Sequence, residues 1–156
     1  MMKAIEILLK PRLQLLQLID SLDLHLLNNV PAGFSNNIAW NLGHIIAAQQ
    51  GVCYLRAGLQ THISTEMYEL YKPGTKPEKF ISQPEVDDFK ALFKSTLDQL
   101  EQDYKDGIFS NYTPWTTRYG VAINNIDDAI SFLPFHDGLH HGYILAQRRA
   151  LLGKQL

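Results

Sequence analysis

The feature that most restricts the fold is a continuous helical pattern of apolar residues from about Asn125 to Leu152. Within it, the stretch FLPFHDGLHHGYILA carries His136 and His140 four residues apart. Positions four apart on an α-helix lie on one face, about one turn above each other. Two imidazoles presented in this way can bind one transition metal ion, but zinc-type chemistry needs a third protein ligand. The segment therefore predicts a long helix that carries two candidate metal ligands.

Three further segments have apolar residues at helical spacing. Residues 2–27 are rich in Leu and Ile, which predicts an amphipathic helix that Pro11 either begins or kinks. A second helix is predicted from Ser35, whose hydroxyl suits an N-cap, to a C-cap near Gly58. The third is predicted to run from the capping-box pattern SQPE at 82–85 to about residue 107.

The connections between these helices differ in character. Residues 59–81 carry prolines, a glycine and scattered charge, which indicates a loop with a short turn of helix from Thr65 to Tyr71. Residues 108–124 are rich in Thr, Tyr, Trp and Val, which indicates an extended excursion or a small hairpin. The predicted fold is all-α, a four-helix bundle with a short extended insert before the last helix. The connections are compatible with an up-down-down-up course of the helices, but the sequence alone does not fix it.

Length and composition predict one folded domain and argue against several functions. The 156 residues are 46% hydrophobic and 19% charged, so we expect a single domain spanning 1–156. The net charge of -2 comes without a basic stripe, which argues against a nucleic-acid partner. The single cysteine, Cys53, excludes an intrachain disulfide and predicts a cytoplasmic location. Lys10 and Pro11 interrupt the apolar N-terminus, so neither a signal peptide nor a membrane span is expected.

The third metal ligand is predicted to be His44. At 100° per residue, His44 shares a narrow face of the second helix with Asn37, Trp40 and several small residues. His136 and His140 share a face of the last helix with Ala129, Leu133, Tyr143 and Gln147. Bundles build metal sites from inward side chains of facing helices, and three imidazoles would leave a coordination position open. The alternative is that these histidines are hydrogen-bonded core residues.

The motifs NNIAWNLGHI, around residue 40, and FHDGLHHGYI, around residue 140, together resemble the DinB-like superfamily, also described as DinB/YfiT-like metalloenzymes. The resemblance covers nearly the whole chain, including the Trp40-x-x-x-His44 pairing. It implies an up-down-down-up four-helix bundle whose divalent metal is held by His44, His136 and His140. Zinc and nickel are the first candidates for that metal and iron is a further one. The resemblance also implies a homodimer.

Four neighbours of these histidines have alternative interpretations. Trp40 either packs over the site and excludes water or is an ordinary core tryptophan. Asn37 either binds a substrate or a metal-bound water, or caps its helix. Tyr143 and Gln147 continue the ligand face and are candidates to line a pocket, and packing is the role expected for Tyr143.

Two other residues close to the pair point elsewhere on the helix. Asp137 is turned about 100° from His136, so it is not expected to be a ligand. It either orients an imidazole or forms a surface ion pair with Arg148 or another base. His141 is turned away as well and is interpreted as a non-ligand. On the second predicted helix, Cys53 is interpreted as a buried structural thiol.

Two functions from different classes are predicted. The first is a divalent-metal-dependent enzyme acting on a small molecule, because an open three-histidine site can activate water or hold a thiolate. The resemblance adds thiol S-transfer or metal-assisted hydrolysis, since relatives include thiol S-transferases and thiol-dependent isomerases. Arg118, Tyr119 and Trp115 of the insert are candidates for substrate contact. The second function is metal binding without catalysis, in a stress-related interaction protein.

Overall fold

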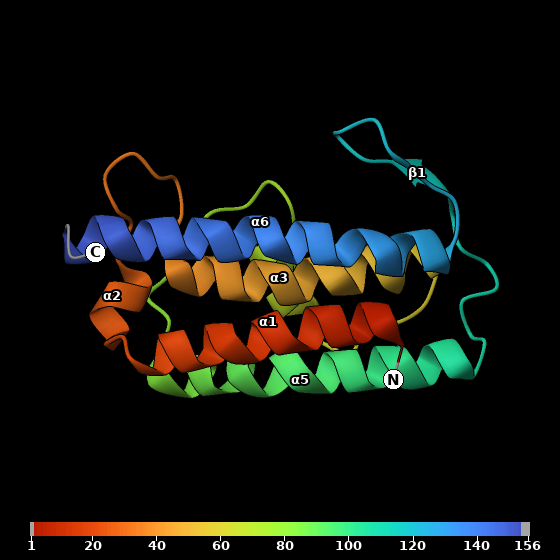
Figure 1. Ribbon diagram of the computed structural model, residues 1–156, viewed down its shortest axis with the longest axis horizontal. Coiled ribbons are helices and arrows are strands. Elements are labelled where there is room, and N and C mark those ends of the chain that lie inside the picture. The colour runs from red at the N-terminus through yellow and green to blue at the C-terminus, as the bar shows by residue number, and fades with distance from the viewer. Residues whose placement is uncertain (1, 154–156) are drawn as a thin grey trace.

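The chain is mostly helical, in agreement with the predicted all-α class (Figure 1). The computed structural model describes residues 2–153, so both ends of the predicted domain 1–156 lie outside the described residues. The four long helices are α1 (Lys3–Asp20), α3 (Ile38–Cys53), α5 (Gln83–Lys105) and α6 (Ile126–Leu152). The shorter elements are α2 (Leu24–Asn28), the 3₁₀ helix η1 (Leu55–Ala57), α4 (Thr65–Tyr71) and the antiparallel strands β1 (Trp115–Thr116) and β2 (Ala122–Ile123).

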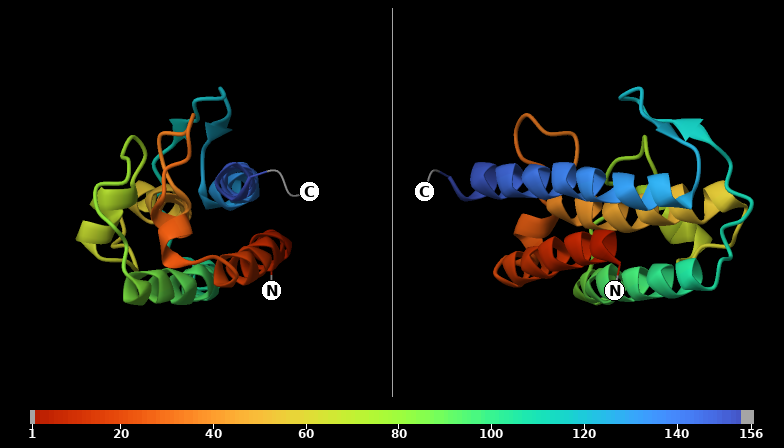
Figure 2. Two further views of the ribbon diagram at one scale, coloured as in Figure 1. Left: turned by 90° about the vertical axis from the view of Figure 1, so that its left-hand side faces the viewer. Right: turned by 45° about the vertical axis from the view of Figure 1, so that its right-hand side comes forward.

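The long helices pack side by side. α3 contacts α6 and α5, and α1 contacts the same two helices. In Figure 1, α1 and α6 run in one direction, whereas α3 and α5 run in the opposite direction. The view along the helices in Figure 2 places α6 at one corner, with the β1–β2 hairpin standing out beside it. No helix within residues 2–153 combines the length and the apolar character that crossing a bilayer requires.

α3 is buried around almost its whole circumference, which differs from the single packing face predicted for it. The additional cover comes from α4, which packs on α3. Two glycines of α3 permit this approach. A Cβ on Gly43 would lie 2.5 Å from the Tyr71 ring, and one on Gly51 would lie 2.9 Å from the Tyr68 hydroxyl oxygen. Periodicity could not reveal this contact, because α4 lies in a segment with no long helical pattern.

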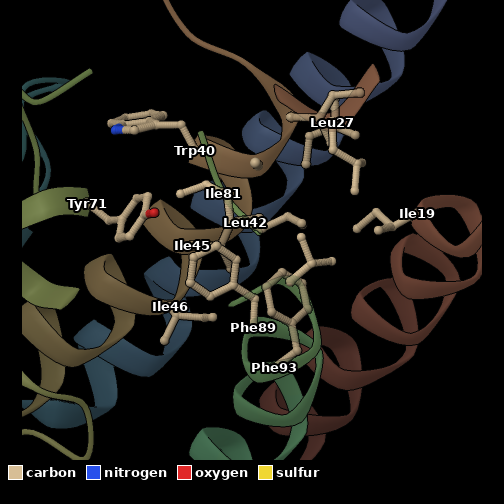
Figure 3. Packing of buried hydrophobic residues seen from close by; sticks show 14 of the residues in the cluster. Ile19, Leu27, Trp40, Leu42, Ile45, Ile46, Tyr71, Ile81, Phe89 and Phe93 are labelled. Carbon is tan, nitrogen blue, oxygen red and sulfur yellow. The ribbon is translucent and has the colours of Figure 1, made fainter. Parts of the chain in front are cut away.

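The apolar core holds α3 in a fixed position relative to α5. Leu42, Ile45 and Ile46 of α3 pack with Phe89 and Phe93 of α5, and all five side chains are buried (Figure 3). Fully burying one such side chain stabilises the fold by roughly 1.5–3 kcal/mol. The backbone of α3 is therefore firmly anchored, and the side chains that it presents toward α6 have defined positions.

The predicted start of the second helix is wrong by two residues. α3 is capped by Asn37 and not by Ser35. The Asn37 side chain accepts a hydrogen bond of 2.8 Å from the backbone N–H of Trp40, which satisfies one free donor of the first turn. Asn37 therefore has the capping role that was one of its two interpretations.

The single helix predicted over residues 2–27 is also wrong. The chain forms α1 and then α2, because the Asp23 side chain accepts the backbone N–H of Leu26 at 2.8 Å and starts a new helix. Pro11 lies inside α1 and does not begin it. Local capping divides this segment, although its apolar spacing continues across the break.

Other predicted boundaries are confirmed, with one exception. The capping box of α5 is present, with Glu85 accepting the backbone N–H of Ser82 at 2.8 Å. The predicted end of the second helix near Gly58 is wrong for α3, which ends at Cys53; Gly58 instead caps η1, with a φ of 70° that glycine adopts without strain. The short helix α4 and the hairpin lie where they were predicted, and Asn125 caps α6 by accepting the backbone N–H of Asp128.

Candidate metal centre

Three histidines from two helices converge between α3 and α6. His44 comes from α3, and His136 and His140 come from successive turns of α6. One nitrogen atom from each ring lies within 4.8 Å of the others. His44 is buried, and the other two rings are partly buried. The tertiary structure thus brings together the three residues that the sequence singled out.

Two of the three imidazoles are oriented by hydrogen bonds at Nδ1. The Nδ1 of His44 lies 2.7 Å from the backbone carbonyl oxygen of Tyr71, and the Nδ1 of His140 lies 2.8 Å from Oδ1 of Asn41. Both partners are oxygen acceptors, so each Nδ1 carries the proton and donates it. Nε2 then remains as the free nitrogen of each ring, which is the arrangement that metal-ligating histidines adopt.

The third imidazole lies beside a buried carboxylate. Nδ1 of His136 is 3.8 Å from Oδ1 of Asp137, and neither atom has a hydrogen-bond partner among the described residues. Buried polar atoms without partners are uncommon in folded proteins. The two atoms are close to hydrogen-bonding distance, so a small rotation of the imidazole would give His136 the same Nδ1 anchor as the other two rings.

Asp137 is held by Arg12, a residue that the sequence interpretation did not select. Nε of Arg12 donates to Oδ2 of Asp137 at 2.7 Å, and Nη1 donates to Oε1 of Gln49 at 2.9 Å. Burial favours a raised pKa for Asp137, but the Arg12 guanidinium outweighs it and lowers the pKa. Asp137 therefore does form an ion pair, but with another base, Arg12, and in the interior, so Arg148 as partner and the surface location are wrong. Arg12 interrupts the apolar stripe of its helix, and that interruption was the available sequence signal.

A polar network surrounds His140 on the α3 side. Asn41 is fully buried, and its Nδ2 donates to Oε1 of Gln147 at 3.2 Å and to Oδ1 of Asn36 at 3.0 Å. Gln147 in turn donates to Asn36. Gln147 therefore supports this network instead of lining a pocket. Asn41 was missed as a site residue, although its position three residues before His44 on an apolar helix was a signal.

Burial keeps two of the histidines neutral at physiological pH. Desolvation lowers the pKa of His44 to about 4 and that of His140 to about 3. The positive charge of Arg118 lowers both pKa values further, and the Asp137 carboxylate opposes it. A neutral imidazole is the protonation state that binds a metal ion, so these rings do not have to lose a proton before they act as ligands.

Trp40 packs over the cluster. Its indole stacks on the His44 ring with centroids 4.7 Å apart and an interplanar angle of 11°, and Nε1 donates to Thr75 at 3.1 Å. The indole excludes water from that face of His44. Tyr143, by contrast, is exposed and contacts Phe34, so it does not line the site.

The hairpin brings an arginine near the histidines. Arg118 lies between β1 and β2, and its charge lowers the pKa of both His44 and His140. Nη2 of Arg118 donates to the hydroxyl of Tyr119 at 3.0 Å. The Tyr119 ring meets Phe135 of α6 edge-on, with centroids 5.2 Å apart. Trp115 lies in β1, and its ring packs against the guanidinium of Arg56.

Three further residues lie outside the cluster. His141 is not part of the three-histidine group, as predicted. His62 lies 3.0 Å from Asp103, at a different place in the fold. Cys53 is fully buried, and burial raises the pKa of its thiol, so it is the inert thiol that the sequence predicted.

The donor set fits a divalent transition metal ion. Neutral imidazole nitrogen binds zinc, nickel, copper and iron(II), and the donor type does not choose among them. The nitrogen atoms lie within 4.8 Å of one another, and two ligands about 2.1 Å from one ion are at most about 4.2 Å apart, so binding requires the rings to move slightly closer together. Three protein ligands leave room in the coordination sphere for water or a substrate.

Comparison with known proteins assigns the family. No curated protein matches the sequence. The family profile described as the DinB superfamily matches residues 9–144. The matched span reaches from α1 into α6 and includes all three clustered histidines. Because the match covers most of the sequence, this chain belongs to the DinB superfamily.

Proposed function

We propose that this protein is a divalent-metal-dependent enzyme in which His44, His136 and His140 are the metal ligands. The observation that carries the proposal is the convergence of one nitrogen atom from each ring within 4.8 Å. The DinB superfamily match supports it. We further propose that the fold is a single-domain, up-down-down-up four-helix bundle, which the opposite directions of the long helices in Figure 1 support. The single, buried Cys53 supports a cytoplasmic location.

The proposed reaction is thiol S-transfer or metal-assisted hydrolysis of a small molecule. A bound ion, with zinc or nickel as first candidates and iron as another, supplies Lewis acidity that lowers the pKa of water or holds a thiolate. The chain supplies orientation: the Tyr71 carbonyl and the Asn41 amide fix the rings of His44 and His140. Trp40 excludes water from one side of the site.

Arg118 is the proposed substrate contact of the hairpin. Its guanidinium lies close enough to the cluster to lower the pKa of two of the histidines. Within the described residues it forms no ion pair, and its one hydrogen bond goes to the neutral hydroxyl of Tyr119. A cation in this position suits a substrate with a negative charge, such as a thiolate or a carboxylate.

The second candidate is metal binding without catalysis, in a stress-related interaction protein. The observation that favours it is that His44 is buried beneath the Trp40 indole. His44 is only 6% exposed, and the Trp40 indole lies flat against it, so a substrate can approach from few directions.

Elemental analysis of protein purified without a histidine tag tests the ligand assignment. We expect stoichiometric metal in the wild type and in His141→Ala, which alters the neighbouring non-ligand. We expect its loss in His44→Ala. Equal metal content in His44→Ala and the wild type would show that His44 is not a metal ligand.

A thiol-consumption assay with electrophilic substrates then separates enzyme from binder. Metal-dependent thiol transfer requires turnover in the wild type and little in His140→Ala. Equal rates in the two proteins would count against this reaction, and stoichiometric metal without turnover would favour the non-catalytic alternative.

A further inference from the structure

A groove lies between α4 and α5. Both helices pack on α3, and the left-hand view of Figure 2 places α4 on the side of α3 that is remote from α6. We call it the α4–α5 groove, and its lining comes from within residues 62–71 and 79–92. Its volume is about 530 Å³. Pockets for small organic ligands typically have volumes of about 300–1,000 Å³, so the groove has the size of a small-molecule site.

Much of the lining of the α4–α5 groove is apolar. Met67 and Leu70 come from α4, and Phe89 and Leu92 come from α5. The members of each pair are three residues apart, so each pair lies on one face of its helix. The Tyr71 ring meets Phe89 edge-on, with centroids 5.3 Å apart, and connects the two walls. A ligand that covers these side chains would remove apolar surface from water, which favours binding.

The charged side chains of the lining are three carboxylates and one ammonium group. Nζ of Lys79 lies 2.6 Å from Oε1 of Glu85, and the charge of Glu66 also acts on Lys79. Within residues 2–153, neither Glu66 nor Asp88 forms an ion pair. Glu66 is on the α4 wall and Asp88 is on the α5 wall. The groove therefore carries a net negative charge, with one unpaired carboxylate on each wall.

We propose that the α4–α5 groove binds a small molecule that has an apolar body and a positively charged amine. The apolar body packs against Met67, Leu70 and Phe89. The ammonium group lies between the two walls, where the carboxylates of Glu66 and Asp88 attract it. Such a ligand matches both the apolar lining and the net charge, whereas a neutral ligand would use only the first of these.

An anionic ligand is the alternative occupant, because Lys79 and His62 also line the groove. Both of these side chains already lie beside an acid. Lys79 pairs with Glu85, and Nε2 of His62 lies 3.0 Å from Oδ2 of Asp103. An anion would compete with these carboxylates for its partners, whereas a cation meets carboxylates that have none. Charge complementarity therefore selects the amine.

The last turn of α4 connects the groove to the histidine cluster. Tyr71 lines the groove, and its backbone carbonyl oxygen lies 2.7 Å from Nδ1 of His44. Leu70 lines it as well, and its carbonyl oxygen accepts the hydroxyl of Thr75, which in turn accepts Nε1–H of Trp40. A ligand that holds α4 in place would therefore hold the anchor of His44. This consequence rests on the proposed function, whereas binding in the groove does not.

Calorimetric titration of the metal-free full chain with octylamine, octanol and octanoate tests the proposal. The three probes share one alkyl chain and differ in charge, so their comparison isolates the contribution of the ammonium group. We expect octylamine to bind about fivefold more tightly than octanol, and octanoate to bind most weakly. Octanol or octanoate binding as tightly as octylamine overturns the proposal. So does the absence of octylamine binding up to about 1 mM.

The double variant Glu66→Gln, Asp88→Asn tests the two unpaired carboxylates. Both positions are exposed, so the variant should remain folded, which thermal unfolding checks. It should bind octylamine about fivefold more weakly and octanol as the wild type does. Asp98→Asn is the matched control, because Asp98 is exposed on the same helix, about 15 Å beyond Asp88. Equal losses in the control and the double variant would indicate nonspecific attraction and overturn the proposal.

Ala91→Trp tests the location of the ligand. Ala91 lines the groove and is exposed, so an indole there would occupy the volume of the ligand without disturbing the core. Binding of octylamine and of octanol should both be lost. Unchanged octylamine binding in a folded Ala91→Trp variant would place the ligand elsewhere and overturn the proposal.

Chelator competition with and without octylamine measures the connection to the histidine cluster. Saturating octylamine should strengthen metal binding about fivefold in the wild type and leave it unchanged in Ala91→Trp. Equal metal affinities with and without octylamine in the wild type would overturn this connection. Because the calorimetric titration uses metal-free protein, failure of the groove and failure of the proposed metal site give different results.

Discussion

Arg12 on α1 and Asp137 on α6 form an ion pair with 2% and 10% of their side chains exposed, over a distance of 2.7 Å. The pair lies directly beside His136. Through Gln49, the same guanidinium also reaches α3. Its Nη1 also donates to the backbone carbonyl oxygen of Phe93 on α5 at 3.2 Å, so one buried cation connects all four long helices next to the candidate metal centre. Breaking the pair should therefore affect both stability and the site.

Arg12→Met should destabilise the protein by about 3–5 kcal/mol, because it leaves the buried Asp137 carboxylate without its cation. Denaturant unfolding of the metal-free protein measures this free energy. Arg12→Met combined with Asp137→Asn removes both charges and should recover part of the loss. A single variant within about 1 kcal/mol of the wild type would show that the pair is not needed for folding.

Asn41→Ala should weaken metal binding about 10–100-fold, because the Asn41 amide oxygen accepts the Nδ1 proton of His140 and orients the ring. Competition with a chelator measures the affinity. Asn37→Ala is the control on the same helix. It removes the N-cap and should lower stability by about 0.5–2 kcal/mol while leaving the affinity unchanged. Similar losses of affinity in both variants would mean that the effect is general destabilisation.

Fluorescence should report metal binding through Trp40 alone. The chain has two tryptophans, and Trp40 stacks on His44 with ring centroids 4.7 Å apart, whereas Trp115 contacts Arg56. Copper(II) or nickel(II) at the cluster should quench indole emission at this short range. We expect strong quenching in Trp115→Phe and little in Trp40→Phe. The reverse pattern would place the ion elsewhere.

Gly43→Ala should destabilise the protein by about 1–3 kcal/mol, in spite of the higher helix propensity of alanine. The new Cβ would lie 2.5 Å from the ring of Tyr71 and push α4 away from α3. Because the Tyr71 carbonyl anchors His44, metal affinity should fall as well. Thermal unfolding and chelator competition measure the two effects. An unchanged melting temperature would show that α4 moves aside without cost.

Lowering the pH should destabilise the first turn of α5, because Glu85 of its capping box becomes protonated. The hydrogen bond from Lys79, with help from Ser82, lowers the pKa of Glu85 from 4.5 to about 2. A folded-state pKa below the unfolded value gives stability that is complete above pH 4.5 and is lost as the pH falls toward 2. Glu85→Gln should therefore show a smaller decrease in melting temperature over this window. Equal slopes for the two proteins would contradict the role of the carboxylate.

Local chemistry in the sequence was enough to predict several elements. The SQPE pattern predicted the capping box of α5, and the acidic first turn after Asn125 predicted the start of α6. These helix starts could be predicted from the sequence because a capping residue and its helix are neighbours along the chain. The same local chemistry was misread at Ser35, where the amide of Asn37, two residues later, is the cap.

The sequence by itself determined the spacing of His136 and His140, because helix geometry places residues four apart on one face. Only the tertiary structure decided what surrounds them. Arg12 and Asp137 are 125 positions apart, and His140 and Asn41 are 99 apart. The anchor of His44 is a backbone carbonyl, which every residue has and which no side-chain pattern marks. The choice of partners depends on how the helices pack in space, and periodicity along one helix carries no information about that packing.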